Sequence, residues 1–212
     1  MAVPTDVVLV QAAVPPRGVA NIARSGAWLA GFPGLAGAQL RPVWSDVSQM
    51  LYLSIALPEP RPVESAQLSE LEQAFQRNFP SVSRVQVSRL SRVFDIPGAS
   101  SGEPPAFHYV VETDPEAGWT EEIGRWYDSE HMPGLAAVPG CVRASRYLNH
   151  DHGPLSYACY DLVTRETLGC EAWLAVRNTD WSSRARPHFT NTRRTMFVLP
   201  DHHPGPGVLP KR

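Results

Sequence analysis

One short motif occurs twice in the chain. Residues 31–41 read Gly-Phe-Pro-Gly-Leu-Ala-Gly-Ala-Gln-Leu-Arg, and residues 137–147 read Ala-Val-Pro-Gly-Cys-Val-Arg-Ala-Ser-Arg-Tyr. Both copies place Pro-Gly, a pair that ends helices and makes turns, directly before a predicted strand. Each copy is therefore a predicted helix exit into a strand, and the chain is predicted to consist of two similar halves.

The same order of predicted elements occurs in both halves. Leu68, Leu71 and Phe75 recur at helical spacing between an N-cap at Ser65 and a stop at Pro80. Apolar or alternating runs predict strands at residues 7–13, 36–44, 50–57 and 85–94, and at 107–112, 142–148, 155–163 and 190–199. The other predicted helices are 18–29, 119–137 and 167–176. Each half therefore has the order β-α-β-β-α-β.

We predict an α+β protein of two tandem ferredoxin-like β-α-β-β-α-β domains. Such a unit covers one face of its sheet with helices and leaves the other face uncovered. Two units can bury their uncovered faces against each other if the two sheets pack into one α/β barrel. The alternative is two domains that each pair with another chain. The predicted parts are an N-terminal domain 1–96, a linker 97–106 rich in Pro, Gly and Ser, a C-terminal domain 107–199 and a disordered tail 200–212.

The composition excludes several classes of partner. Hydrophobic residues make up 43% and charged residues 19%, which is typical of a globular chain. A net charge of −2 offers no basic field for nucleic acid or for a membrane surface, and no apolar segment approaches the roughly 20 residues of a membrane span. We expect a cytoplasmic monomer or homodimer whose partner is a small-molecule substrate.

The sequence predicts neither a metal nor a cofactor. Cys141, Cys159 and Cys170 are an odd number without metal-binding spacing, so neither a disulfide nor a zinc site is indicated. The pair of histidines in the loop 150–152 has no third ligand nearby. The only lysine, Lys211, lies in the tail, which excludes Schiff-base chemistry.

Two segments of the second half resemble a known family. Residues 126–135 read Trp-Tyr-Asp-Ser-Glu-His-Met-Pro-Gly-Leu, and Val-Pro-Gly at 138–140 precedes a strand with Ser-Arg-Tyr at 145–147. They resemble the EthD-like and stress-responsive branches of the dimeric α/β-barrel superfamily, over about half of the chain. The resemblance implies an apolar cavity with a few polar groups. The superfamily uses it in isomerases, cyclases, lyases, cofactorless monooxygenases and haem-handling enzymes.

The helix from Trp119 carries the first candidate residues. Trp126 follows the buried helical stripe and is predicted to be core, although it could also contact substrate. Tyr127 and His131 lie four apart on the adjoining stripe, and His131 is either a catalytic base or a cation at the helix C-terminus. Glu130 either orients an imidazole or pairs with an arginine such as Arg146.

The strands carry the remaining candidates. Arg146 and Tyr147 alternate across one strand, and Arg146 is the predicted anchor for an anionic or carbonyl oxygen. His108 shares a strand face with Glu112, so His108 is either a base that Glu112 orients or a satisfied histidine at a strand end. His188 precedes the last strand, either as a catalytic group at a barrel rim or as a loop residue.

These residues predict an enzyme that moves protons without a cofactor. The substrate would be a small, largely apolar, carbonyl-bearing metabolite, and the reaction an isomerisation, cyclisation or elimination. His131 or His188 would be the base and Tyr127 the acid. The alternatives are a cofactorless or haem-dependent monooxygenase, with His131 or His108 as the haem ligand, and a non-catalytic binding protein. Residues 26–31 of the first half carry no titratable group at the aligned position, so we expect the second half to hold the site.

Overall fold

The chain divides into two compact units. The computed structural model describes residues 4–15, 29 and 31–200. Unit 1 comprises Met1–Ser91 with Phe197–Arg212, and unit 2 comprises Arg92–Met196. Most of the helix predicted at 18–29 and all of the predicted tail after Pro200 lie outside the described residues.

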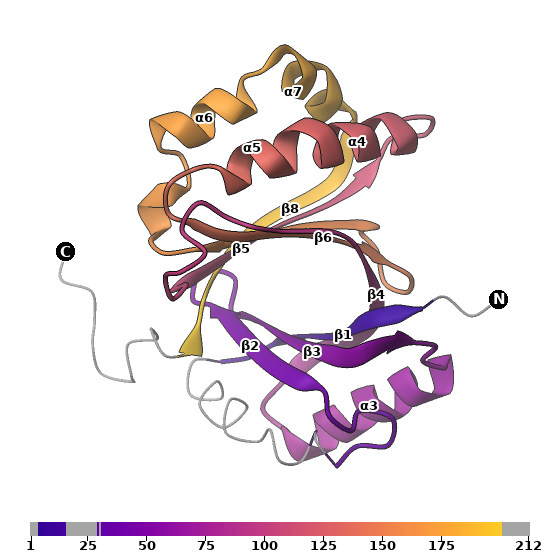
Figure 1. The fold of residues 1–212 in the computed structure, drawn as a ribbon. Helices are drawn as coiled ribbons and strands as arrows, with labels where there is room; N and C mark the ends of the chain where they lie inside the picture. The colour runs from indigo at the N-terminus through magenta and orange to yellow at the C-terminus, as the bar shows by residue number, and fades with distance from the viewer. Residues whose placement is uncertain (1–3, 16–28, 30, 201–212) are drawn as a thin grey trace. The chain divides into compact units, whose positions relative to one another are not determined.

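Unit 1 is an antiparallel sheet with one described helix. Its strands are β1 (Thr5–Ala13), β2 (Gln39–Ser45), β3 (Met50–Arg61) and the first part of β4 (Ser83–Pro97), and its helix is α3 (Ser65–Asn78). β1 lies between β3 and β4, and β2 pairs with the other edge of β3. Helix α3 lies against one face of this sheet (Figure 1).

The packing of α3 follows from its sequence. Leu68, Leu71 and Phe75 are buried in one core cluster, as their spacing predicts. The predicted cap is wrong by one residue, because Ser65 is already helical. Glu64 is the cap, and its backbone N–H donates to the side chain of Gln67 at 2.9 Å.

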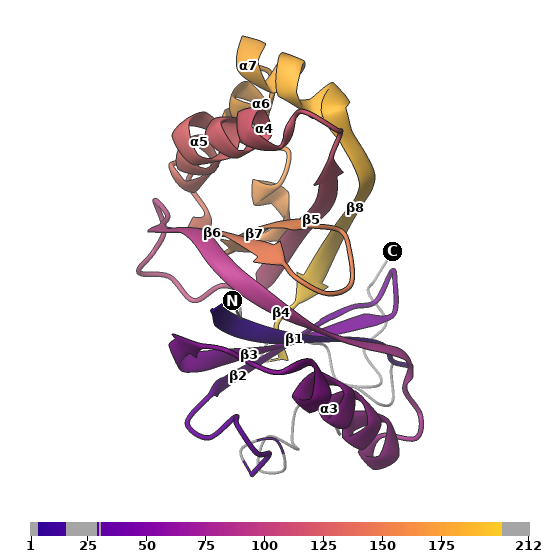
Figure 2. The ribbon, with the colours of Figure 1, turned by 90° about the vertical axis from the view of Figure 1, so that its right-hand side faces the viewer.

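Unit 2 has the β-α-β-β-α-β order that the sequence predicts for the second half. Its elements are β5 (Phe107–Pro115), α4 (Thr120–Trp126), a π-helical turn (Tyr127–His131), α5 (Met132–Ala136), β6 (Cys141–Asn149), β7 (Ser156–Leu162), α6 (Glu171–Arg177), α7 (Asp180–Ala185) and β8 (Phe189–Val198). β7 pairs with β5 and β6, and β8 lies beside β5. Helices α4 to α7 cover one face of this sheet (Figures 1 and 2).

The glycine of each Pro-Gly motif has the backbone conformation that the motif predicts. Gly34 has φ +81° and Gly140 has φ +91°, a region that residues with a side chain rarely adopt. A Cβ atom on Gly140 would lie 2.4 Å from the Thr167 hydroxyl. Both motifs are therefore tight turns into a strand, β2 in unit 1 and β6 in unit 2.

The segment 97–106 is fastened to β6. The backbone N–H of Gly98 donates to Val142 and that of Ser100 to Cys141, both at 2.8 Å. A Cβ atom on Gly98 would lie 2.1 Å from the Cys141 carbonyl oxygen, so only glycine permits this approach. The predicted linker is thus part of unit 2, while the tandem repeat and the closure of two sheets into one barrel remain predictions.

The core of unit 2 is aromatic. Trp126, Trp173, Tyr127 and Tyr160 are among the largest fully buried side chains of the described residues. They lie between the helices and the sheet in one cluster. None of the helices within the described ranges is long and apolar enough to cross a membrane.

Candidate active site

A π-helical turn shapes the centre of unit 2. In a regular α-helix, Trp126 and His131 would lie about 140° apart around the axis, because each residue advances about 100°. The wider turn over Tyr127–His131 reduces this offset. The rings of Trp126 and His131 stack with their centroids 4.2 Å apart and 24° between their planes. Tyr127 meets the same imidazole edge-on at 5.7 Å.

These three side chains line a cavity on the helix-covered face of the sheet. Its volume is about 30 Å³. The walls are aromatic or aliphatic except for one histidine and three arginines, and the lining residues are Tyr109, Val111, Trp126, Tyr127, His131, Leu135, Tyr160, Trp173, Arg177, Arg186, Phe189 and Arg194. No carboxylate is among them. The structure thus brings together three of the predicted site residues, Trp126, Tyr127 and His131.

His131 is buried and neutral. Only 8% of the residue is exposed, and its Nδ1 atom is buried without a hydrogen-bond partner in the described part of the chain. Burial lowers its pKa to about 3, and the positive charges of Arg186 and Arg177 act in the same direction. The prediction of a cationic helix cap does not fit this environment, because the imidazole carries no charge at neutral pH.

Trp173, which also lines this cavity, carries a second buried polar atom, its indole Nε1, without a partner in the described part of the chain. Buried polar atoms in folded proteins nearly always find a partner, so an unpaired one needs an explanation. Two residues that line the cavity, His131 and Trp173, thus each carry a polar atom that the described residues leave unpaired.

Tyr127 is a phenol that keeps its proton. It is 1% exposed, and burial raises its pKa, while the charge of Arg146 opposes this shift. Its ring stacks on Phe189 at 5.9 Å. The Arg146 guanidinium lies 5.4 Å from the ring centroid, within reach of a cation–π interaction. The hydroxyl of Tyr127 is therefore a hydrogen-bond donor in the cavity wall at all pH values below that raised pKa.

Arg146 faces the helices but does not line the cavity. Its guanidinium donates to both oxygens of Asp128, at 2.9 and 3.0 Å, and its side chain is 8% exposed. Glu130 instead accepts a hydrogen bond from the Thr179 hydroxyl at 2.7 Å. One prediction is therefore corrected: Asp128, not Glu130, is the partner of Arg146. The charge of Arg146 is balanced by this carboxylate, and its role as an anchor for a substrate oxygen remains a prediction.

The cations in the cavity wall are three other arginines. Arg177 ends α6, Arg186 lies in the turn before β8, and Arg194 is on β8. Arg177 and Arg186 are half-buried, whereas Arg194 is exposed at the rim. The Arg186 side chain donates to the backbone oxygen of Arg177 at 3.2 Å. Sequence reasoning missed this set because the three residues share no motif.

An irregular backbone on β8 explains why Arg194 was missed. In a regular strand, Phe189 and Arg194 would face opposite sides, because side chains alternate. Asn191 has φ +50° and interrupts the alternation. Phe189 and Arg194 consequently line the same cavity. Asparagine tolerates a positive φ angle better than most residues. The presence of Asn191 within the predicted strand was therefore the only sequence signal that Arg194 could face the cavity.

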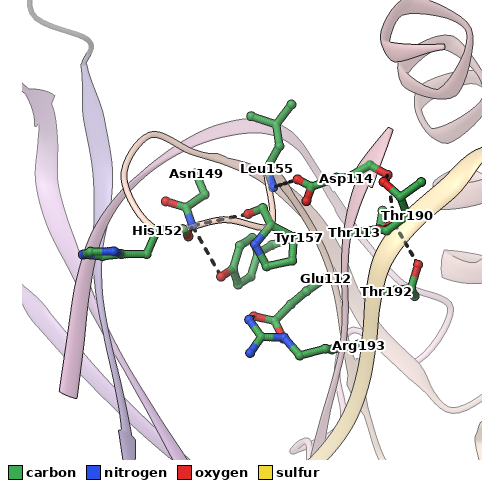
Figure 3. Close-up of polar contacts among 11 residues, drawn as sticks. Glu112, Thr113, Asp114, Asn149, His152, Leu155, Tyr157, Thr190, Thr192 and Arg193 are labelled. Atoms are coloured by element: carbon green, nitrogen blue, oxygen red, sulfur yellow. Dashed lines mark hydrogen bonds and ion pairs between the residues drawn. The ribbon is translucent and has the colours of Figure 1, made fainter. Parts of the chain in front are cut away.

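Polar contacts fasten β8 to β5 (Figure 3). Arg193 binds Glu112 with its Nε atom 3.2 Å from Oε2, and Glu112 is almost completely buried. The Thr113 hydroxyl donates to the Thr190 carbonyl at 3.1 Å and lies 3.0 Å from the Thr192 hydroxyl. These bonds hold the strand that carries Arg194. The close-up also shows Asp114 accepting from the Leu155 backbone, which ties β5 to the loop before β7.

The predicted His108 and Glu112 pair does not form. His108 Nδ1 lies 2.7 Å from an oxygen of Asp161, its partner across β7, while Glu112 binds Arg193. The next residue, Tyr109, lines the cavity, so alternation places His108 on the opposite, helix-free face of the sheet. Tyr147 lies on that face as well, because its neighbour Arg146 faces the helices.

His188 is a structural residue outside the cavity. Its Nδ1 lies 2.5 Å from a Glu116 oxygen, and its ring stacks on Trp119 at 3.4 Å. The backbone N–H of Glu116 also donates to the His188 carbonyl at 2.8 Å. His188 therefore joins the start of β8 to the connection between β5 and α4, and it is neither a solvated loop residue nor a cavity group.

Comparison with known proteins identifies the fold. No family model matches the chain, and no curated protein matches it. Three solved structures, each 11% identical, match nearly whole: a "putative monooxygenase" from Lactobacillus acidophilus NCFM (92% of this chain, 93% of that one, TM-score 0.61), an anthrone oxidase-like protein (91% and 90%, 0.62) and a mutant chlorite dismutase from Candidatus Nitrospira defluvii (92% and 92%, 0.59).

The chain therefore shares the fold of these three proteins. At this level of identity the likeness defines the architecture alone. The predicted superfamily and its EthD-like branch both remain predictions.

Proposed function

We propose that unit 2 catalyses proton transfer, without a bound cofactor, on a small and largely apolar carbonyl compound. The observation that carries this proposal is His131, whose Nδ1 is buried without a partner among the described residues and whose side chain lines an aromatic cavity with Tyr127 and the arginines. The reaction class is isomerisation, cyclisation or elimination. All three can begin with removal of a proton from a carbon next to a carbonyl group.

The first step needs only groups that the chain provides. The neutral imidazole of His131 takes the proton, and the electrons of the broken C–H bond move into the carbonyl oxygen to form an enolate. The Tyr127 hydroxyl or an arginine donates a hydrogen bond to that oxygen. Return of the proton from His131 to another atom completes an isomerisation, and expulsion of a leaving group completes an elimination.

The basicity of His131 increases as negative charge develops on the substrate. With the cavity empty, a pKa of about 3 makes His131 a weak base. A negative charge about 5 Å away stabilises the imidazolium by about 3 kcal/mol at an effective dielectric constant near 20, which raises the pKa by about two units. This stabilisation grows as the enolate forms, so it acts on the transition state more than on the bound substrate.

Substrate entry requires side chains to move. A volume of about 30 Å³ holds about two water molecules. The long arginine side chains at the rim, above all the exposed Arg194, can swing outward without any change in the backbone. The aromatic wall then receives an apolar ring, and the arginines close over its polar end.

Proton exchange tests the proposal directly. We would incubate the protein in D2O with a panel of aryl methyl ketones and follow loss of the methyl proton signal by NMR. His131→Gln should slow exchange at least about 100-fold, the size expected for loss of a general base. His188→Gln is the matched control and should leave the rate unchanged. Equal rates in His131→Gln and the wild type would remove His131 from the mechanism, and an inert wild type would favour a binding protein.

A second candidate is oxidation of a phenol in the same cavity. It is favoured by the structural neighbours described as a monooxygenase and as anthrone oxidase-like. Oxygen uptake with an electron-rich phenol, in protein without a visible absorption band, would support it over proton transfer. Haem at His131 does not fit, since the imidazole stacks on Trp126 in a cavity far smaller than a porphyrin. A Soret band would contradict that conclusion.

A further inference from the structure

We infer that the cavity selects planar anions, namely aromatic or conjugated rings that carry a carboxylate. The inference rests on the proposed function in that it names the substrate class of the same cavity. The inference goes beyond the proposed function because that function requires a carbonyl group but no charge on the substrate.

The cavity wall is rich in hydrogen-bond donors and poor in acceptors. Arg177, Arg186 and Arg194 offer only donors, as does the orphaned Trp173 Nε1. The Tyr127 side chain is buried, and its hydroxyl keeps its proton because burial raises its pKa. The acceptors among these side chains are one nitrogen of the neutral His131 imidazole and the phenol oxygens of Tyr109, Tyr127 and Tyr160. A ligand that satisfies this wall must therefore present several acceptor oxygens.

The arginines of the cavity differ from several other arginines of unit 2. Arg143, Arg146 and Arg193 each form an ion pair, with Asp95, Asp128 and Glu112 respectively. In the described part of the chain, no such pair is formed by Arg177, Arg186 or Arg194. The three come from separate elements and converge on one cavity. An anion bound there would relieve their mutual repulsion, and the planar guanidinium fork matches a carboxylate.

The apolar part of the wall sets the shape of the ligand. Trp126 and Phe189 meet edge to face with their ring centroids 5.8 Å apart, and Tyr127 stacks on Phe189. Flat aromatic surfaces of this kind favour a flat ring between or against them. The combination of aromatic wall and arginine rim thus favours a planar ring with a carboxylate at one end.

Binding of benzoate and its neutral analogue benzamide tests the inference without turnover. We would titrate both into the full-length protein by calorimetry. Benzoate should bind with a Kd of about 1 mM or tighter, and benzamide at least about tenfold more weakly. Arg186→Gln and Arg177→Gln should each weaken benzoate at least about tenfold and leave benzamide unchanged. Arg184→Gln, which removes an exposed arginine two residues away, should change neither.

Each outcome separates the inference from the proposed function. Equal binding of the two compounds, benzoate weaker than about 10 mM, or unaltered affinity in both arginine variants would overturn the anion inference. Proton exchange that depends on His131 with neutral ketones but not with carboxylate-bearing ones would overturn it too, while leaving the proposed function intact. Arginine-dependent benzoate binding without His131-dependent exchange would support the inference and reject the proposed reaction. Unfolding curves for each variant verify that it is folded.

Discussion

The imidazole of His131 stacks on the indole of Trp126 at 4.2 Å, although the two residues are five positions apart in one helical segment. This pairing requires the π-helical turn between α4 and α5. It also buries the imidazole against an apolar surface, which keeps it neutral. The local backbone irregularity and the unusual protonation of His131 therefore have one origin.

Replacement of Trp126 by alanine should reduce stability strongly. The side chain is 1% exposed, and its Nε1 donates to the Ser182 hydroxyl at 3.3 Å. Loss of a buried tryptophan costs about 3–5 kcal/mol through lost burial and a new cavity. Chemical denaturation measures the free energy of unfolding. Leu174→Ala is the control, since Leu174 is 40% exposed and should change stability by less than about 1 kcal/mol. Equal effects of the two substitutions would place Trp126 outside the core.

The stability of the protein should fall as the pH drops from 7 to 5 because of His131. The pKa of His131 is about 3 in the folded state, against 6.5 in an unfolded chain. Between these values the unfolded chain binds a proton that the folded protein does not, so stability rises with pH. The wild type should lose about 2 kcal/mol relative to His131→Gln between pH 7 and 5. Denaturation curves of both proteins at each pH test this, and parallel behaviour would show that the imidazole is solvated.

Asp128→Asn should destabilise the protein more than Asp95→Asn. Each carboxylate binds an arginine, but the Arg146 side chain is 8% exposed and that of Arg143 is 46% exposed. Loss of the partner leaves Arg146 charged and buried, at a cost of about 1–3 kcal/mol, whereas an exposed pair contributes about 0–1 kcal/mol. Thermal unfolding of the two variants compares them directly. A larger loss for Asp95→Asn would contradict the assigned burial.

His188→Ala should affect folding and leave chemistry intact. His188 binds Glu116 and stacks on Trp119 away from the cavity, so its removal loosens the start of β8. We expect a cost of about 1–2 kcal/mol in unfolding free energy. The proton-exchange rate per folded molecule should remain within about twofold of the wild type. A loss near that of His131→Gln, in a folded variant, would return His188 to the catalytic groups.

The sequence alone determined the local structure of unit 2 and the centre of its candidate site. Periodicity located the strands and helices, and the Pro-Gly motif located the turns at Gly34 and Gly140, because positive φ angles select glycine. The Trp-Tyr and Glu-His pairs at 126–127 and 130–131 pointed to the helix that carries Tyr127 and His131. These features depend on neighbours in the chain, which a single sequence displays.

Only the tertiary structure decided which side chains meet across the fold. It formed the ion pairs Arg146–Asp128, His108–Asp161 and Arg193–Glu112. It also brought three arginines into the wall of one cavity, namely Arg177, Arg186 and Arg194. Two backbone irregularities, the π-helical turn and Asn191, redirect side chains against the regular helical and strand periods. Pairing over long chain distances depends on strand register and helix placement, and neither is encoded in the spacing of residues along one segment.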